Sequence, residues 1–284
     1  MKVGVVGAGV MGTGLAESLA EAGHDVLLVD TSQDTLDRVR ESIEKSLKMR
    51  RLFGGKKELP KIEDLMLKIF TSTTTAILEQ AEFVIENVTE DIALKEEIYA
   101  DLDAVVGPKA CFAVNTSAVL VERLASRTNR PDKVLGIHFM NPVPLKDTVE
   151  VIRAPATSDE TMETAMRLLE SMGKNGIVVN DAPGFVSNRI LMLTVNEAVA
   201  VVDEGTADAQ TVDRIFKECF GHKMGPLETA DLIGLDTILD TLEVLHAQLG
   251  DEKFVPHSLL KAKVDAGDLG RKTGTGFHRY GGRG

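Results

Sequence analysis

A histidine and a glutamate in the middle of the chain carry the side chains best suited to proton transfer. His138 ends a short apolar run, and Glu150 follows 12 residues later, between two valines where an apolar side chain would be expected. Histidine has an unperturbed pKa of about 6.5, so it can accept and return a proton near neutral pH. A carboxylate bonded to the distal ring nitrogen would orient it. Two interpretations remain open: a base with its orienting acid, or two polar residues accommodated by packing.

The composition restricts the classes of partner. The 284 residues suffice for one large domain or two ordinary ones, and 43% apolar with 27% charged residues is typical of a globular protein. A net charge of −12 and the absence of tryptophan disfavour nucleic acids and anionic membranes. The two cysteines, Cys111 and Cys219, form neither a metal-binding spacing nor a disulfide framework, and no signal-peptide pattern opens the chain. We therefore expect a cytoplasmic protein with no metal site, no nucleic-acid partner and no membrane association.

Short β-branched runs alternate with helical patterns over residues 1–180. The predicted strands are 2–6, 25–29, 82–86, 111–115, 134–139, 148–152 and 176–180. The predicted helices include 10–22, 32–50, 91–105 and 158–171. Such alternation predicts βαβ units and a mostly parallel sheet, so the fold class is α/β with a Rossmann-type domain at the N-terminus.

The pattern changes after Pro183 and Gly184. From there apolar residues recur at spacings of three and four, without a convincing strand. We therefore predict two domains, a Rossmann-type domain over 1–182 and an all-α domain over 183–284.

A glycine-rich turn at the start of the chain predicts a dinucleotide site. The pattern Gly7-x-Gly9-x-x-Gly12 follows the first strand and opens the first helix, whose N-terminus can bind phosphate. Asp30 ends the second strand, where a carboxylate binds ribose hydroxyls and repels a 2′-phosphate; no arginine follows it in 31–33. The cofactor is therefore predicted to be NAD, with the 1–182 domain as its binding domain. The loop residues expected to contact it are Gly7, Gly9, Val10, Met11 and Gly12.

Seven segments in order give the chain a resemblance to the L-3-hydroxyacyl-CoA dehydrogenase family, which includes the bacterial 3-hydroxybutyryl-CoA dehydrogenases. The resemblance implies an enzyme that oxidises a 3-hydroxyacyl thioester reversibly to the 3-oxoacyl thioester with NAD. It covers nearly the whole chain. The segments are GAGVMG, VIENVTED, NTSAV, GIHFMNPVP, VEVI, PGFVSNRIL and GRKTGTGF.

The resemblance also assigns catalytic roles. It makes His138 the base that takes the hydroxyl proton and Glu150 its partner. Ser117 and Asn188 would hold the substrate oxygen through uncharged hydrogen bonds. From the residues alone, Ser117 could also cap a helix that begins at 118, which is compatible with that role, and Asn188 could lie on an ordinary helix surface.

By the same analogy, Glu90, Lys95 and Asn115 would lie near the nicotinamide half of the cofactor. Lys48 would help to hold coenzyme A, and Asn141 is counted with Ser117 and Asn188 as substrate-binding. A solvated basic helix face is the other interpretation of the segment around Lys48. The basic residues in that segment are Lys45, Lys48, Arg50, Arg51, Lys56 and Lys57.

Several alternatives stay open at this level. The same basic patch would suit an acidic carrier protein, so an enzyme that oxidises a hydroxyacyl-carrier-protein for a polyketide extender unit is an alternative to an acyl-CoA dehydrogenase. A non-catalytic NAD-binding protein is a third interpretation. The segment 145–148 is more polar than the corresponding stretch of the family. Asn87 likewise stands where the family usually has a small apolar residue. Dense apolar residues over 185–202 and 235–249 predict a homodimer formed through the helical domain.

Overall fold

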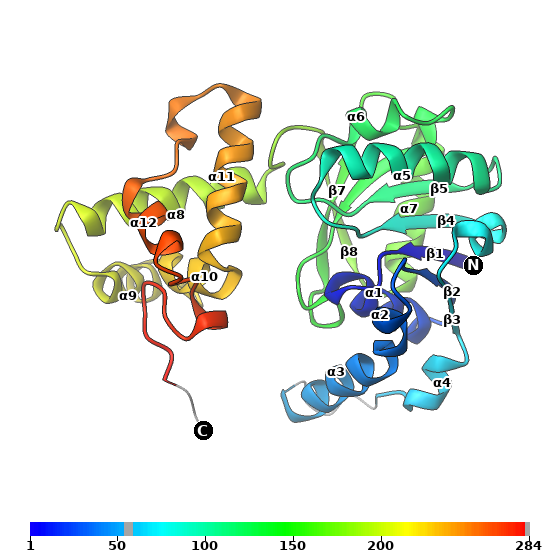
Figure 1. Cartoon of the computed structure of the whole chain (residues 1–284), viewed down its shortest axis with the longest axis horizontal. Helices are drawn as coiled ribbons and strands as arrows, with labels where there is room; N and C mark the ends of the chain where they lie inside the picture. The colour runs from blue at the N-terminus through cyan, green and yellow to red at the C-terminus, as the bar shows by residue number, and fades with distance from the viewer. Residues whose placement is uncertain (54–58, 282–284) are drawn as a thin grey trace. The chain divides into compact units, whose positions relative to one another are not determined.

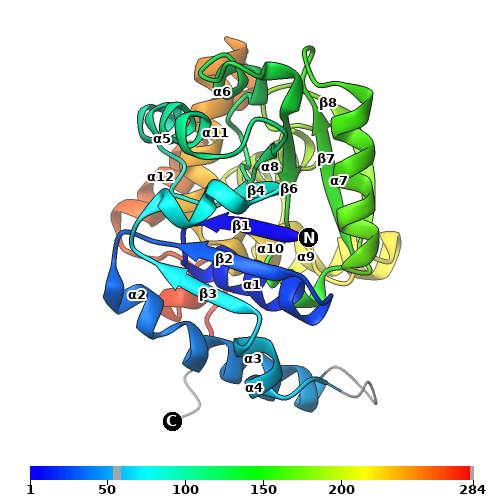
Figure 2. The same ribbon diagram turned by 90° about the vertical axis from the view of Figure 1, so that its right-hand side faces the viewer.

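The computed structural model describes residues 1–53 and 59–281, and in them the chain divides into two compact units, Met1–Ala182 and Pro183–Gly284. The first unit is built on one eight-stranded sheet of order β3-β2-β1-β4-β5-β6-β7-β8 (Figures 1 and 2). Every neighbouring pair is parallel except β6 and β7. The strands are β1 Lys2–Val6, β2 Asp25–Val29, β3 Ile69–Ser72, β4 Phe83–Glu86, β5 Cys111–Val114, β6 Val134–His138, β7 Thr148–Arg153 and β8 Asn175–Asn180. The predicted α/β fold class with a mostly parallel sheet is thereby confirmed.

The edge strand β3 was not among the predicted strands. It has four residues, of which Ile69 is buried while Phe70 is 49% exposed. A strand this short, on a sheet edge with one buried apolar residue, lacks the apolar run that marks the central strands.

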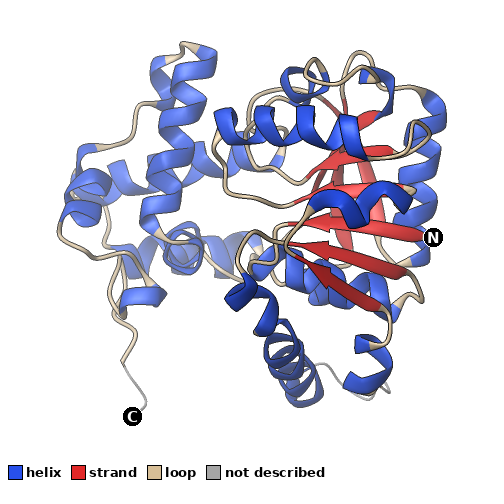
Figure 3. Ribbon diagram, turned by 45° about the vertical axis from the view of Figure 1, so that its right-hand side comes forward, coloured by secondary structure: helices blue, strands red, loops and turns tan. Residues whose placement is uncertain are grey.

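Helices cover both faces of the sheet (Figure 3). One face packs its apolar residues against α1 Val10–Glu21, α3 Val39–Phe53, α4 Ile62–Met66 and α7 Asp159–Ser171. On the other face lie α5 Ile92–Val105 and α6 Val121–Ala125, with Tyr99 of α5 set edge-on against Phe112 of β5. Because side chains alternate along a strand, Ile137, Val149 and Val151 face the first layer and their neighbours His138 and Glu150 face the second.

The predicted helix over 32–50 is two helices. Ser32 caps α2 Gln33–Asp37 by accepting a hydrogen bond from the Thr35 amide (3.2 Å), and Arg38 separates α2 from α3. The short first helix brings the following segment back across α1, which it contacts.

The second unit is helical, as its apolar spacing predicts. Its helices are α8 Ser187–Asp203, α9 Ala209–Phe220, α10 Pro226–Ile233, α11 Leu235–Leu249 and α12 Ser258–Asp265. Among residues 183–281 no β-strand forms, and the only bridges are isolated ones at 270–279. The apolar residues of α11 that seemed surplus, such as Leu235, Ile238 and Leu242, are fully buried in this unit's own core.

Two buried aspartates fasten the C-terminal segment to that core. Asp231 accepts hydrogen bonds from the amides of Phe277 (2.9 Å) and His278 (2.8 Å) and from the Tyr280 hydroxyl (3.0 Å). Burial and the bond to Asp231 raise the pKa of Tyr280 to about 12. Asp213 accepts from two amides at the start of α10 and lies 2.6 Å from the His278 ring. The GRKTGTGF segment is therefore held by carboxylates that a local sequence pattern does not identify.

Candidate active site

The glycine turn lies where the strand order reverses, between β1 and β4, which is where open α/β sheets bind ligands. Gly7 has φ +92°, and a Cβ there would lie 2.9 Å from the Asn87 carbonyl oxygen. A Cβ on Gly12 would lie 1.8 Å from the Gly7 carbonyl oxygen, so helix and strand approach too closely for any side chain. Apart from its neighbours in the chain, no atom of residues 1–53 and 59–281 lies within 4 Å of a Cβ placed on Gly9. Two glycines are thus required by the fold, and the third leaves open space beside the turn.

The other two loop residues predicted to bind the cofactor, Val10 and Met11, differ in burial. Val10 begins α1 and is 77% exposed, whereas Met11 packs against the core. Asp30 follows β2, and its two carboxylate oxygens accept hydrogen bonds from the amides of Ala8 (2.8 Å) and Ser32 (2.9 Å). A carboxylate held against the glycine turn in this way is placed for a ribose, and the open space fits a pyrophosphate at the helix N-terminus.

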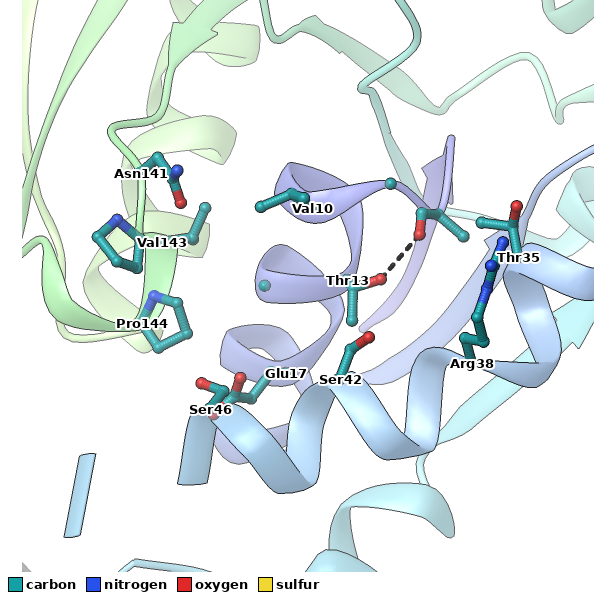
Figure 4. A pocket seen from close by; sticks show the side chains of 14 residues that line it. Val10, Thr13, Glu17, Thr35, Arg38, Ser42, Ser46, Asn141, Val143 and Pro144 are labelled. Carbon is teal, nitrogen blue, oxygen red and sulfur yellow. Dashed lines mark hydrogen bonds between the residues drawn. The ribbon is translucent and has the colours of Figure 1, made fainter. Parts of the chain in front are cut away.

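A pocket of about 330 Å³ opens beside this turn (Figure 4). The turn and α1 form one side, with Val10, Thr13 and Glu17 toward the space; Ser42 and Ser46 of α3 lie below them. The segment 141–144 forms the opposite side, and it includes the exposed Asn141. Arg38 also lines the pocket beside Thr35, although no arginine directly follows Asp30.

His138, Glu150 and Ser117 come together at the carboxyl end of β6. His138 and Glu150 are paired residues of the antiparallel strands β6 and β7, and Nδ1 of the ring lies 2.9 Å from Oε2 of the carboxylate. Nε2 lies 3.2 Å from the Ser117 hydroxyl oxygen. The histidine and glutamate are buried, at 6% and 9% exposure. The ring therefore has a carboxylate at one nitrogen and a hydroxyl at the other.

Glu90 holds the loop that carries Ser117. Its Oε1 accepts hydrogen bonds from the amides of Ser117 (2.8 Å) and Ala118 (3.1 Å) and from the Thr116 hydroxyl. Lys95 is fully buried, and its ammonium lies 2.8 and 2.9 Å from the two carboxylate oxygens of Glu86 and 3.6 Å from Glu90. Burial raises the pKa of the Glu86 carboxyl, and Lys95 opposes that shift. Lys95 was predicted to contact the cofactor; its ammonium is directed into this buried pair.

Asn115 joins the ends of neighbouring strands. Its Oδ1 accepts from the Phe139 amide (3.1 Å), directly after His138, and its Nδ2 donates to Oδ1 of Asn87 (2.7 Å). Asn87 in turn donates to the carbonyl of Ile85 (3.1 Å). The polar residue at 87 thus supports Asn115 from the adjacent strand end.

The prediction that Ser117 caps a helix is wrong. The helix α6 begins at Val121, and the side chain at its N-terminus is that of Asp181, which accepts from the amides of Val121 (3.1 Å) and Glu122 (2.8 Å). Burial raises the pKa of the Asp181 carboxyl. Because 60 residues separate these partners, spacing along the chain does not reveal the cap.

The basic segment is only partly available to a ligand. The Arg50 side chain is largely buried between α1 and α3 and pairs with Glu17 (2.9 Å) and Glu21 (2.8 Å). The expectation that Arg50 belongs to a phosphate-binding cluster is therefore wrong. Lys45 pairs with Glu41 across one turn of α3. Lys48 is exposed on α3, two residues from Ser46 of the pocket lining. Lys56 and Lys57 lie outside the described residues.

Asn188 is the second residue of α8, in the second unit, and is half-buried. The turn before it is unusual because Gly184 and Phe185 both have positive φ, +69° and +50°. A buried, bulky residue in the left-handed region costs conformational energy, and such strain concentrates at functional sites. The segment PGFVSN is singled out by its resemblance to the family, but no sequence pattern indicates the positive φ of Phe185.

A glycine turn at the switch point of a Rossmann-type sheet, with a histidine–carboxylate pair at the carboxyl edge, defines the class of dinucleotide-dependent oxidoreductases. Residues 2–182 match the 3-hydroxyacyl-CoA dehydrogenase NAD binding domain, and residues 184–280 match the 3-hydroxyacyl-CoA dehydrogenase C-terminal domain. The chain belongs to the 3-hydroxyacyl-CoA dehydrogenase family, and its cofactor is NAD. The predicted family and cofactor are confirmed, and the interpretation as a non-catalytic NAD-binding protein is set aside.

Individual relatives resemble the chain over its full length. A probable 3-hydroxybutyryl-CoA dehydrogenase of Deinococcus radiodurans is 44% identical over 280 residues, which are 99% of this chain and 100% of the relative. The crystal structure of FadB2 from M. tuberculosis has a TM-score of 0.93 at 36% identity, covering 98% of both chains. That of the (S)-3-hydroxybutyryl-CoA dehydrogenase PaaH1 from Ralstonia eutropha has a TM-score of 0.92 at 39% identity, covering 99% of both. Within residues 1–53 and 59–281, no helix has the length and apolar character that crossing a bilayer requires.

Proposed function

We propose that the chain catalyses the NAD-dependent oxidation of a 3-hydroxyacyl-CoA, such as 3-hydroxybutyryl-CoA, to the 3-oxoacyl-CoA, and the reverse reduction. The observation that carries the proposal is the Ser117–His138–Glu150 arrangement at the carboxyl edge of an NAD-binding sheet. The names of the relatives from D. radiodurans and R. eutropha support the 3-hydroxybutyryl group as the acyl group.

His138 acts as the base in this proposal. The Nδ1–H group donates a hydrogen bond to the Glu150 carboxylate, so the neutral ring presents the lone pair of Nε2 to the substrate hydroxyl. As Nε2 takes the proton, the Glu150 carboxylate stabilises the imidazolium and keeps the ring from turning. The tautomer is an assignment that follows from these partners.

Ser117 positions the reacting oxygen. Its hydroxyl lies 3.2 Å from Nε2, close enough for a substrate hydroxyl to contact both groups. Asn188, in the second unit, is assigned the same role from the family resemblance alone. Glu90 holds the end of β5 through the amides of Ser117 and Ala118, and Asn115 holds the end of β6 through the Phe139 amide. NAD, bound along the glycine turn and Asp30, supplies the hydride acceptor. Lys48 contributes a positive charge for the phosphates of coenzyme A.

The formation of NADH with 3-hydroxybutyryl-CoA tests the function directly. We expect turnover with NAD and the (S)-3-hydroxyacyl thioester, and a loss of that turnover in His138→Ala at matched protein concentration. A protein that forms no NADH with short-, medium- or long-chain 3-hydroxyacyl-CoA would contradict the proposal.

A comparison of carriers distinguishes the alternative substrate. The same 3-hydroxybutyryl group is offered on coenzyme A and on an acyl carrier protein, and kcat/KM is measured for each. We expect the coenzyme A thioester to be preferred. A preference of the opposite sign would assign the enzyme to the carrier-protein alternative.

We also propose a homodimer formed through the helical unit. The apolar residues of α11 are explained by the core of the unit, but Ile215 and Phe220 of α9 and Leu232 of α10 are 45%, 65% and 53% exposed. Large exposed apolar residues on neighbouring helices are typical of an interface. Sedimentation at micromolar concentration tests the proposal, and a stable monomer would contradict it.

A further inference from the structure

A buried lysine lies beneath one side of the pocket. Lys174 follows α7 and directly precedes β8, and it is 8% exposed. Its ammonium donates hydrogen bonds to the main-chain carbonyls of Val143 (2.7 Å) and Lys146 (2.8 Å). Removing a charged group from water is costly unless its hydrogen bonds are made, so a lysine in this place calls for a structural or functional reason.

The two carbonyls belong to a segment whose first part, residues 141–144, lines the pocket opposite α1. This segment, residues 141–147, contains the 3-10 turn Val143–Leu145. On its pocket side it packs against α1, because a Cβ on Gly14 would lie 3.4 Å from both Val143 and Pro144. On its other side are Lys174 and the Asn175 amide, which donates to the Asp147 carbonyl (2.6 Å). The turn is thus held between α1 and the residues that begin β8.

The position of this segment matters for a ligand that reaches His138. The segment begins three residues after His138, and the pocket extends from it to Ser42 and Ser46 of α3. In the proposed function, a thioester whose hydroxyl contacts His138, and whose carrier lies near Lys48, would pass along residues 141–144, which line the pocket. The side of the pocket that Lys174 supports is therefore the side along which the substrate arm lies.

We propose that Lys174 is a positioning residue that holds segment 141–147 against α1 and thereby sets the affinity of the enzyme for its thioester substrate. The inference rests on the proposed function. Burial lowers the pKa of Lys174, with Asp147 opposing the shift, so the fold keeps this cation at a cost that a neutral side chain would avoid. The acidic and basic groups that act on it electrostatically are Asp147, Arg50 and Glu21.

The replacement Lys174→Met removes the two hydrogen bonds and keeps most of the side-chain volume. We expect KM for 3-hydroxybutyryl-CoA to rise about 10-fold while kcat stays within about threefold. The reason is that a displaced segment weakens the binding of the substrate and of the transition state alike. The catalytic pair is held separately, by the backbone pairing of β6 with β7. The dissociation constant for NADH, followed by NADH fluorescence, should stay within about twofold, since the cofactor is held by the glycine turn and Asp30.

Arg130→Met provides the matched control. Arg130 also donates to main-chain carbonyls, those of Asp103, Val106 and Gly107, and it pairs in addition with the Asp103 carboxylate (2.6 Å). It precedes β6, at the opposite end of that strand from His138. This variant should lose stability with an unchanged KM. Lys174→Gln keeps an N–H donor and should recover part of the affinity; it also serves if the methionine variant does not fold.

The outcomes separate the two proposals. Wild-type activity with a raised KM in Lys174→Met and an unchanged KM in Arg130→Met supports the inference. If the parent protein is active but KM is unchanged in folded Lys174→Met, the inference is overturned and the proposed function stands. The same holds if KM changes equally in Lys174→Met and Arg130→Met. A wild-type protein inactive on every 3-hydroxyacyl thioester overturns the proposed function itself.

Discussion

His138 and Glu150 are paired across the one antiparallel junction of the sheet, with Nδ1 and Oε2 2.9 Å apart. Their contact depends on backbone pairing, because residues opposite each other on antiparallel strands bring their side chains to the same face. A parallel β7 would have needed a crossover connection, whereas here nine residues, 139–147, join the two strands. The direction of β7 therefore makes the pair possible.

Replacing the proposed base tests the centre of the mechanism. We expect His138→Ala to lower turnover by about 10²-fold or more while NADH binding and the fold are retained, because general acid–base catalysis contributes at least that much. Steady-state NADH formation measures the loss. His246→Ala is the matched control, since His246 lies on α11 with its ring bonded to the Asp251 carbonyl. Equal activity in the two variants would remove His138 from the mechanism.

Replacing its partner should have a smaller effect. Glu150→Gln keeps the size and a hydrogen-bonding group but removes the charge that stabilises the imidazolium. We expect kcat to fall by about 10-fold to 10²-fold, with little change in KM. Full activity in this variant would show that Glu150 is a packing residue with no part in proton transfer.

Two glycines of the same turn should respond differently to alanine. Beyond its chain neighbours, no atom of the described residues lies within 4 Å of a Cβ added to Gly9, and its φ is −65°. The free energy of unfolding of Gly9→Ala should therefore stay within about 0.5 kcal/mol of the parent. The methyl group should nevertheless raise the dissociation constant for NADH about 10-fold, because it fills the space into which the pyrophosphate must approach. NADH fluorescence titration and urea unfolding measure the two effects.

Gly12→Ala is the contrasting variant. Its Cβ would lie 1.8 Å from the Gly7 carbonyl oxygen, so the helix must move and the protein should lose stability as well as cofactor affinity. If Gly9→Ala bound NADH normally, the pyrophosphate would have to be placed elsewhere.

The buried pair of Glu86 and Lys95 should be sensitive to the loss of one partner. Both side chains are at most 1% exposed, so Glu86→Gln leaves a buried ammonium without its main carboxylate. We expect a loss of about 3–5 kcal/mol in the free energy of unfolding, measured in urea. The double variant Glu86→Gln, Lys95→Met should be more stable than Glu86→Gln alone, and a less stable double variant would contradict this account.

The pH dependence of stability should reveal Glu17. Burial raises its pKa above 4.5, and its bonds to Ser46 and Arg50 lower it only in part. A raised pKa means that the folded state binds more protons than the unfolded state. The contribution of Glu17 is therefore present below pH 4.5 and is lost as the pH rises through the folded pKa.

Glu17→Gln removes this titration. Relative to the parent, it should gain free energy of unfolding as the pH rises from 4.5 to neutrality, by about 1.4 kcal/mol for each pKa unit of the shift. Urea unfolding across this range measures the difference. Glu21→Gln, which removes the more exposed partner of Arg50, is the control; a constant difference between Glu17→Gln and the parent would refute the prediction.

Local patterns in the sequence predicted the central strands well because these are apolar on both faces and bounded by turn residues. The pattern also indicated Gly7, Gly12 and Asp30, since backbone geometry at a βα turn restricts residue type. The edge strand β3 escaped notice because only Ile69 of it is buried while Phe70 stays exposed.

Contacts between distant segments could not be predicted from the sequence. The pairing of Arg50 with Glu17 joins residues 33 apart, and it turns an apparent phosphate ligand into a structural ion pair. The Asp181 cap on α6 and the bonds of Lys174 to residues 143 and 146 also depend on the folded topology. No local sequence pattern marks these side chains, and each has its structural role because the fold buries it beside a distant partner.

The loop between β6 and β7 has both of its ends fixed by the sheet, at His138 and at Thr148. Sequence changes at the exposed positions 145–147 can therefore accumulate without displacing the catalytic pair, whereas Phe139 and Val143 are buried in the core. Replacing the loop by the equivalent residues of a relative with another acyl preference should therefore alter the selectivity of the enzyme for the acyl group. The main-chain carbonyls at 143 and 146 must then stay within hydrogen-bonding distance of Lys174.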